Sequence, residues 1–155
     1  MEFTQNCETV ADDSYPNRLG RSFFVPLYVW VALGSAAGGL ARFLLGTLIQ
    51  QRFGSTFPLG TLAINVSGSL ALGFLLRYTL GTAAVGPEIR ALLTSGFCGG
   101  YTTFSTFSYE TAALIEDGDY HRAAWYLALS VAFSLAGAFL GIALAREALA
   151  LRRRF

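Results

Sequence analysis

Four apolar stretches alternate with short polar linkers along the chain. They run from Pro26 to Ile49, Pro58 to Leu80, Ile89 to Ile115 and Ala123 to Ala145. Each is close to the roughly 20 residues that a helix needs to cross a bilayer, and turn-forming residues fill the linkers between them. The pattern predicts an all-α membrane protein with four transmembrane helices in one bundle.

The third stretch departs from this simple pattern. From Gly96 to Glu110 it reads Gly-Phe-Cys-Gly-Gly-Tyr-Thr-Thr-Phe-Ser-Thr-Phe-Ser-Tyr-Glu, so glycines and hydroxyls stand where a lipid-facing helix would be apolar. Polar or unwound backbone is tolerated at membrane depth only where it is buried in protein or lines a water-filled cavity. We therefore expect the third helix to be broken near its middle, beside a path for a polar solute.

The composition is typical of a multi-pass protein of the cell membrane. Charged residues make up 14% of the chain, whereas soluble domains carry about 25%. We divide the chain into a polar flexible tail (1–22), a four-span domain (23–148) and a basic end (149–155) that anchors at the membrane edge. A net charge of +1 argues against nucleic-acid binding. Cys7 and Cys98 have no metal-ligand spacing, and we do not expect them to pair.

Polar residues inside the apolar stretches need partners. A guanidinium in a span is costly, so Arg42 either snorkels to the interface or attracts an anion. Asn65 must satisfy its amide group, either in a contact between helices or in a pore. Glu110 would repel an anion, so we expect it at an end of the path, beside a cation, or protonated. Small residues on two faces predict tight helix packing: Gly34, Gly38 and Gly39 in the first span, and Gly137 and Gly141 in the fourth.

Aromatic and hydroxyl side chains are concentrated in the third and fourth spans. Phe104 and Phe107 fall on one helical face, where they either pack in the core or turn their positive ring edges towards an anion. Hydroxyls near them can donate hydrogen bonds to the same ion. Tyr126, Ser130 and Ser134 recur every four residues, which would align a stripe of hydroxyls about 12 Å long on the fourth helix.

Taken together, these residues resemble the small fluoride channels of the CrcB/Fluc family. The resemblance covers roughly residues 27 to 145. It rests on Gly38-Gly39-Leu40-Ala41-Arg42, on the run from Pro58 through Asn65 to Gly68, and above all on Gly96 to Glu110. Gly-Gly-Xaa-Thr-Thr-Phe-Ser-Thr-Phe is its most specific part, because few other families combine this run with an asparagine in the preceding span.

The resemblance implies an architecture and a set of roles. The fold would be an antiparallel, dual-topology dimer of four-helix subunits, with two fluoride pores at the subunit boundary and a structural sodium ion on the two-fold axis. The main-chain carbonyls of Gly99 and Thr102 would hold the sodium. Fluoride would pass an aromatic box and a polar lining, with Arg42 near a pore mouth; the lining residues would be Asn65, Phe104, Ser105, Thr106, Phe107, Tyr126, Ser130 and Ser134.

The implied activity is passive export of fluoride, which lowers its toxicity. Fluoride holds its water tightly, so a selective pore must replace that water with close, oriented donors. A lysine inside the pore would trap the ion, and the chain contains no lysine. The sequence shows no catalytic constellation around His121, its only histidine, so we do not expect an enzyme.

Two other functions remain open at this point. A small four-span, proton-coupled drug or guanidinium exporter would need a carboxylate deep in its first span, where this chain has Arg42. A non-conducting membrane assembly subunit could use the same glycine faces, but it would not need Asn65 together with a broken span and a hydroxyl stripe.

The arginines outside the spans are unevenly distributed between the two sides. Arg52 and Arg122 lie on one predicted side, and Arg42 and Arg146 are set aside as parts of spans. The other predicted side, which carries both termini, holds seven arginines. The positive-inside rule therefore favours both termini in the cytoplasm. An antiparallel dimer then needs either reversed copies of this chain or an oppositely oriented homologue. The seven arginines on the side of the termini are Arg18, Arg21, Arg77, Arg90, Arg152, Arg153 and Arg154.

Overall fold

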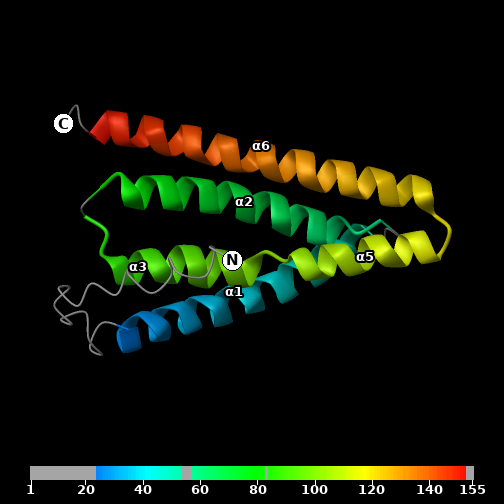
Figure 1. Cartoon of the computed structure of the whole chain (residues 1–155), viewed down its shortest axis with the longest axis horizontal. Helices are drawn as coiled ribbons and strands as arrows, with labels where there is room; N and C mark the ends of the chain where they lie inside the picture. The colour runs from blue at the N-terminus through cyan, green and yellow to red at the C-terminus, as the bar shows by residue number, and fades with distance from the viewer. Residues whose placement is uncertain (1–23, 54–56, 83, 153–155) are drawn as a thin grey trace, which may run out of the picture.

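The computed structural model describes residues 24–53, 57–82 and 84–152, with side chains from residue 27 onward. The predicted tail (1–22) lies outside the described residues. The described part contains helices and no strand, which confirms the all-α class. Its long helices are α1 (Phe24–Phe53), α2 (Leu59–Leu80) and α6 (Tyr120–Arg152) (Figure 1), and each is apolar and long enough to cross a bilayer.

The stretch that we predicted as the third span is a series of shorter segments. It consists of α3 (Pro87–Ala91), the π-helical segment η1 (Leu92–Cys98), α4 (Gly99–Tyr101) and α5 (Phe104–Glu116). Thr102 and Thr103, between α4 and α5, have extended backbone angles of φ −81°, ψ 157° and φ −149°, ψ 116°. In Figure 1 the series runs alongside α1 and α2 and continues into the turn before α6.

Local sequence signals explain where these helices begin and end. Pro58 precedes α2, and Pro87 is the first residue of α3, where its missing N–H costs nothing. The turn between α5 and α6 uses Gly118 at φ +77°, a conformation that other residues rarely adopt. Asp119 then accepts the N–H of Arg122 at 3.2 Å, which caps the first turn of α6. The helix continues beyond the predicted Ala145 to Arg152.

Glycines of α1 allow that helix to lie directly against η1 and α4. A Cβ atom on Gly34 would collide with the carbonyl oxygen of Leu92, and one on Gly38 with that of Phe97. The predicted packing face is therefore confirmed at these two positions. It is wrong for Gly39, where a Cβ would have nothing within 4 Å, because this residue faces a hollow beside Arg42.

The second predicted glycine face joins α6 to α2. A Cβ on Gly137 would lie 3.0 Å from the carbonyl oxygen of Val66, and one on Gly141 would collide with that of Leu70. Close backbone approach of this kind is how transmembrane helices pack without a hydrophobic driving force. The α2–α6 pair thus forms one wall of the bundle, and α1 with η1 and α4 forms the other (Figure 1).

Candidate functional site

The extended residues between α4 and α5 are held by the side chain of Asn65 in α2. The backbone N–H of Thr103 donates to Asn65 Oδ1 at 2.8 Å, and Asn65 Nδ2 donates to the carbonyl of Thr103 at 3.0 Å. The carboxamide therefore pairs with both backbone polar groups of one residue, the N–H and the C=O of Thr103, as a neighbouring strand would. Asn65 is a contact between helices, and its second Nδ2 hydrogen is left for another acceptor.

The hydroxyl of Thr103 organises the first turn of α5. Its Oγ1 accepts the backbone N–H of Thr106 at 3.1 Å, so Thr103 is the N-cap of this helix. The same oxygen donates to Thr106 Oγ1 at 3.0 Å and lies 3.1 Å from Ser105 Oγ. Ser105 and Thr106, both predicted as polar lining, are exposed members of this hydroxyl cluster.

A hollow of about 360 Å³ lies between α2, α5 and α6 and brings together five of the predicted pore residues. The hydroxyl oxygen of Ser130 is buried there and has no hydrogen-bond partner among the described residues. A buried donor without a partner is rare in folded proteins. The hollow therefore offers a donor to a polar guest. The predicted residues that line it are Asn65, Phe104, Phe107, Ser130 and Ser134.

The two phenylalanines of the predicted aromatic box have different environments. Phe107 is 9% exposed and packs against Tyr126, with ring centroids 5.2 Å apart. Phe104 is 79% exposed, although its ring centroid lies 5.7 Å from that of Phe107. Phe107 is thus part of the core, and Phe104 projects from the surface of the single chain.

Arg42 lies in a second hollow, of about 320 Å³, on the other side of Thr103. Its Nη1 donates to the carbonyl of Thr102 at 3.3 Å. Thr61, Thr103 and Thr106 line the same space. Because Thr103 lines both hollows, its side chain and peptide form the partition between them.

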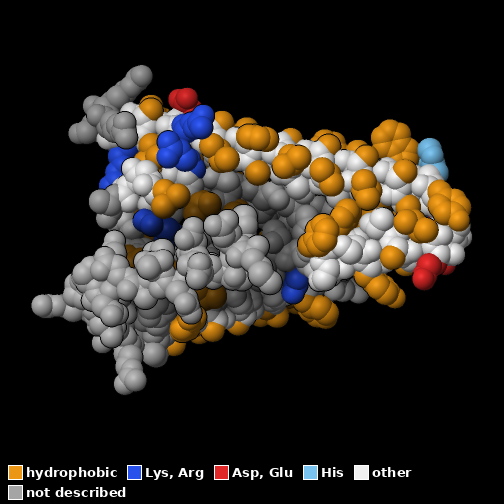
Figure 2. Space-filling model, in the orientation of Figure 1, with side chains coloured by type: hydrophobic (Ala, Val, Ile, Leu, Met, Phe, Trp, Pro, Cys, Tyr) orange, Lys and Arg blue, Asp and Glu red, His pale blue; other side chains and the backbone are white. Residues whose placement is uncertain are grey.

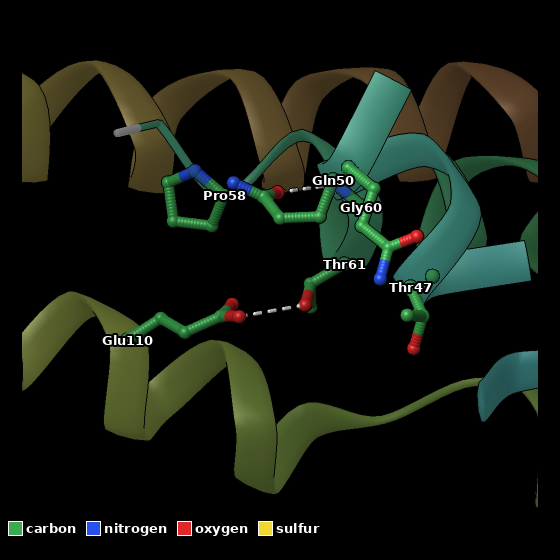
Figure 3. A pocket seen from close by; sticks show the side chains of 8 residues that line it. Thr47, Gln50, Pro58, Gly60, Thr61 and Glu110 are labelled. Carbon is green, nitrogen blue, oxygen red and sulfur yellow. Dashed lines mark hydrogen bonds between the residues drawn. The ribbon is translucent and has the colours of Figure 1, made fainter. Parts of the chain in front are cut away.

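Glu110 lies in a third hollow, of about 500 Å³, at the end of α1 and the start of α2 (Figure 3). Thr61 donates to Glu110 Oε1 at 2.9 Å, and Tyr126 donates to Oε2 at 2.6 Å. Gln50 lies across the hollow and joins α1 to α2, since its Oε1 accepts the N–H of Gly60 at 3.4 Å (Figure 3).

These contacts alter two expectations from the sequence. No basic side chain of the described residues forms an ion pair with Glu110, so hydroxyls bind the carboxylate in place of a cation, which was one of the three alternatives expected for it. Tyr126 was expected to continue the stripe of Ser130 and Ser134, but its hydroxyl turns to Glu110 and does not line the hollow of those serines.

Sequence reasoning missed Thr61, Thr103 and Gln50 as site residues. A threonine in an apolar helix gives no signal of its own, because its hydroxyl can bond to its own helix. Thr61 lies 49 residues before Glu110, so only the packing of α2 against α5 brings them together. The one available signal was the position of Thr103 directly before the α5 pattern, which is where an N-cap threonine belongs.

The carbonyls of Gly99 and Thr102 suit a hard cation in part. The N–H of Thr103, helical partner of the Gly99 carbonyl, donates to a side chain of α2 instead. The N–H of Thr106, helical partner of the Thr102 carbonyl, donates to a hydroxyl. Both oxygens are thus released from the helical ladder, as carbonyls that bind alkali cations must be. The guanidinium of Arg42 occupies one lone pair of the Thr102 carbonyl oxygen, and its positive charge would repel a cation there.

Comparison with known proteins places this sequence in a family. Residues 29–142 match the model of the family described as "CrcB-like protein, Camphor Resistance (CrcB)". The chain belongs to the CrcB family. A relative from Syntrophotalea carbinolica is 47% identical over 119 residues, which cover 77% of this chain and 97% of that protein. Relatives from Coxiella burnetii and Geobacter sulfurreducens are 46% and 44% identical, over 95% and 94% of their lengths and 76% of this chain.

All three relatives carry the name "Fluoride-specific ion channel FluC". Ion channels are not a class of enzyme. With three described helices that are apolar and long enough to cross a bilayer, this CrcB-family member is a multi-pass protein of the cell membrane.

Proposed function

We propose that this chain forms a fluoride-selective channel that passively exports fluoride from the cytoplasm, and that it is not an enzyme. The observation that carries the proposal is the hollow between α2, α5 and α6, where Asn65 and Ser130 offer donors beside Phe104 and Phe107. The name that these relatives carry supports fluoride as the ion.

Selectivity follows from the donors that line this hollow. Fluoride must lose tightly held water, so each lost water needs a close replacement. The free Nδ2 hydrogen of Asn65 and the unpartnered hydroxyl of Ser130 supply two such donors. The positive ring edges of Phe104 and Phe107 stabilise an anion without binding it as firmly as a fixed cation would.

The three hollows form a candidate path. The hollow of Glu110 shares Gly46, Thr47 and Thr61 with that of Arg42, and Thr103 separates the latter from the hollow of Asn65. In this proposal the positive charge of Arg42 attracts the anion. The hydroxyls of Ser105 and Thr106 then donate hydrogen bonds to it as it passes Thr103. An inside-negative membrane potential then drives export with about 2.3 kcal/mol per charge per 100 mV.

We further propose that α3, η1, α4 and α5 together form a broken third transmembrane span and that two copies associate antiparallel. The exposed ring of Phe104 supports this, because a second copy would cover it. The carbonyls of Gly99 and Thr102 of both copies would then bind the structural sodium. By binding oxygens from both copies, the ion would hold the two broken helices together.

Fluoride efflux from liposomes tests the proposed function. Purified full-length protein should release fluoride under a membrane potential and without a proton gradient, whereas protein-free liposomes should stay silent. Transport of guanidinium compounds that requires a proton gradient would replace the channel by a coupled exporter. Absence of any flux from correctly folded protein would leave a non-conducting assembly subunit.

A further inference from the structure

A groove between α2 and α6 lies outside the proposed ion path. It measures about 350 Å³ and is lined mainly by apolar side chains, among them Leu76 and Leu80 of α2 and Ala138 and Ile142 of α6. Its floor is closed, because Gly73 touches the backbone of α6: a Cβ there would collide with the carbonyl of Ala138. The result is an apolar slot at membrane depth.

Guanidinium groups stand at one end of this slot. Arg77 itself lines the groove and is exposed. Arg146 follows Ile142 by four positions on α6 and therefore lies on the same face of that helix. Among the described residues, neither arginine has a carboxylate within ion-pair distance.

Two more arginines lie close by, at the turn after α2. Arg90 donates to the carbonyl of Thr79 at 3.0 Å, and its buried Nε has no partner within the described part of the chain. Arg152 donates to the hydroxyl of Thr82 at 2.7 Å. Figure 2 shows basic side chains gathered at this end of the molecule, with hydrophobic side chains along the helices beyond it.

We propose that this groove binds an anionic phospholipid. The acyl chain lies in the slot along Leu76 and Ile142, and the phosphate pairs with Arg77 and Arg146 at its mouth. Guanidinium groups bind phosphate through two parallel hydrogen bonds. Arg77 lies in the last turn of α2, which would place its guanidinium at the depth of the headgroups. Basic clusters between helices at a membrane surface recognise anionic headgroups for this reason.

A second copy of the chain is the competing occupant. The groove shares Ser69 and Leu72 with the hollow of Asn65, so a subunit that covers that hollow can reach the groove as well. The charge at the mouth favours lipid: a second copy would have to bring a carboxylate to Arg77, whereas an anionic lipid carries its own phosphate.

Native mass spectrometry of the full-length protein in detergent tests the proposal, with phosphatidylglycerol, phosphatidylcholine or inorganic phosphate added. We expect retention of phosphatidylglycerol over phosphatidylcholine, and no competition from phosphate alone. The Arg77→Gln, Arg146→Gln double variant should retain about tenfold less phosphatidylglycerol, and either single variant should lose part of that. Arg52→Gln, at the opposite end, is the matched control and should retain it fully.

An Ile142→Trp variant fills the slot and leaves every charge in place. It should also lose phosphatidylglycerol. Equal retention of both lipids, unchanged retention in the double variant, or full competition by inorganic phosphate would each overturn the lipid site. Loss of the dimer in Ile142→Trp with unchanged lipid retention would assign the groove to a second copy. None of these readouts depends on fluoride flux, so they stand or fall separately from the channel.

Discussion

At the scale of single residues, Asn65 joins two tasks that are usually separate. Its carboxamide binds both the backbone N–H and the backbone C=O of Thr103, and its remaining hydrogen is available to a polar solute in the hollow. A residue that only lined a pore would be dispensable for folding. Asn65 is predicted to matter for both folding and conduction.

Replacing Asn65 by Asp should lower both stability and flux. The carboxylate keeps the acceptor for the Thr103 N–H but places a second oxygen against the Thr103 carbonyl, where Nδ2 now donates. The loss of this part-buried bond, with the Thr103 carbonyl left unpaired, should cost about 1 kcal/mol. Thermal unfolding in detergent and fluoride efflux measure the two effects, with Ser67→Ala as an exposed α2 control. Wild-type stability together with lost flux would reduce Asn65 to a lining residue.

The two phenylalanines should respond differently to isoleucine. Phe107→Ile removes a buried ring contact with Tyr126, so it should lower stability by about 1 kcal/mol as well as flux. Because the ring of Phe104 is exposed, Phe104→Ile should leave the stability of the single chain unchanged. It should still reduce flux, because it removes the positive ring edge. Comparing unfolding with efflux for each variant separates the effects. Wild-type flux in both would leave the rings as packing only.

At the scale of helices, neighbouring glycines of α1 provide a matched test of packing. Gly38→Ala should disrupt the contact of α1 with η1 and α4, because the new methyl group meets backbone atoms that cannot move aside. Gly39→Ala meets nothing within 4 Å and should be neutral, or stabilising by up to about 1 kcal/mol through helix propensity. Melting curves of the two proteins check this. Equal effects would contradict the close approach at Gly38.

The elements were largely predictable from sequence, and the contacts were not. Hydropathy located the helices because the bilayer fixes their length, and the glycine-rich run marked where the backbone becomes extended. The sequence could not show that Tyr126 bonds to Glu110, since either could have faced a pore. Nor could it assign the partner of Asn65: amide chemistry fits many acceptors, and only the packing of α2 against the extended residues selects the Thr103 peptide.

At the scale of the whole molecule, Gly99 offers a test that distinguishes the fold of one copy from the proposed association of two copies. A Cβ on Gly99 would have nothing within 4 Å in the single chain, whereas one on Gly100 would lie 2.5 Å from the carbonyl oxygen of Ser35. Gly99→Val should therefore preserve the helices and abolish the dimer, and more so than Thr102→Ser, which keeps its carbonyl. Circular dichroism and cross-linking test this, with Gly100→Val as the variant that should fail to fold.

Charge also distinguishes the two ends of the molecule. Arg77, Arg90, Arg146 and Arg152 lie at the end where α2 and α6 finish, and Arg52 and Arg122 lie at the other end, where α1 finishes and α6 begins. Arg146, which was set aside as part of a span, lies at the end with more arginines. Among the described residues, the structure therefore strengthens the uneven distribution of arginines that the sequence indicates. An antiparallel pair of identical chains would have to place half of these clusters against the positive-inside rule.

Reporter fusions at the C-terminus should therefore give a signal on the cytoplasmic side alone. If an oppositely oriented homologue completes the channel, fluoride flux should appear only on co-expression of the two chains. Signals on both sides, with flux from this chain by itself, would instead establish a homodimer of reversed copies.

The bond between Asn65 and the Thr103 peptide has a consequence for how the chain enters the membrane. With 13 residues, α5 is shorter than a bilayer crossing, and the peptide before it has lost its helical partners. Hydrocarbon penalises unpaired peptide groups by several kcal/mol, and the group that satisfies this peptide belongs to α2. If α3 to α5 form the proposed broken span, its second half would settle at full depth only after α2 is in place beside it, and we expect the bundle to be assembled from the N-terminal half onward.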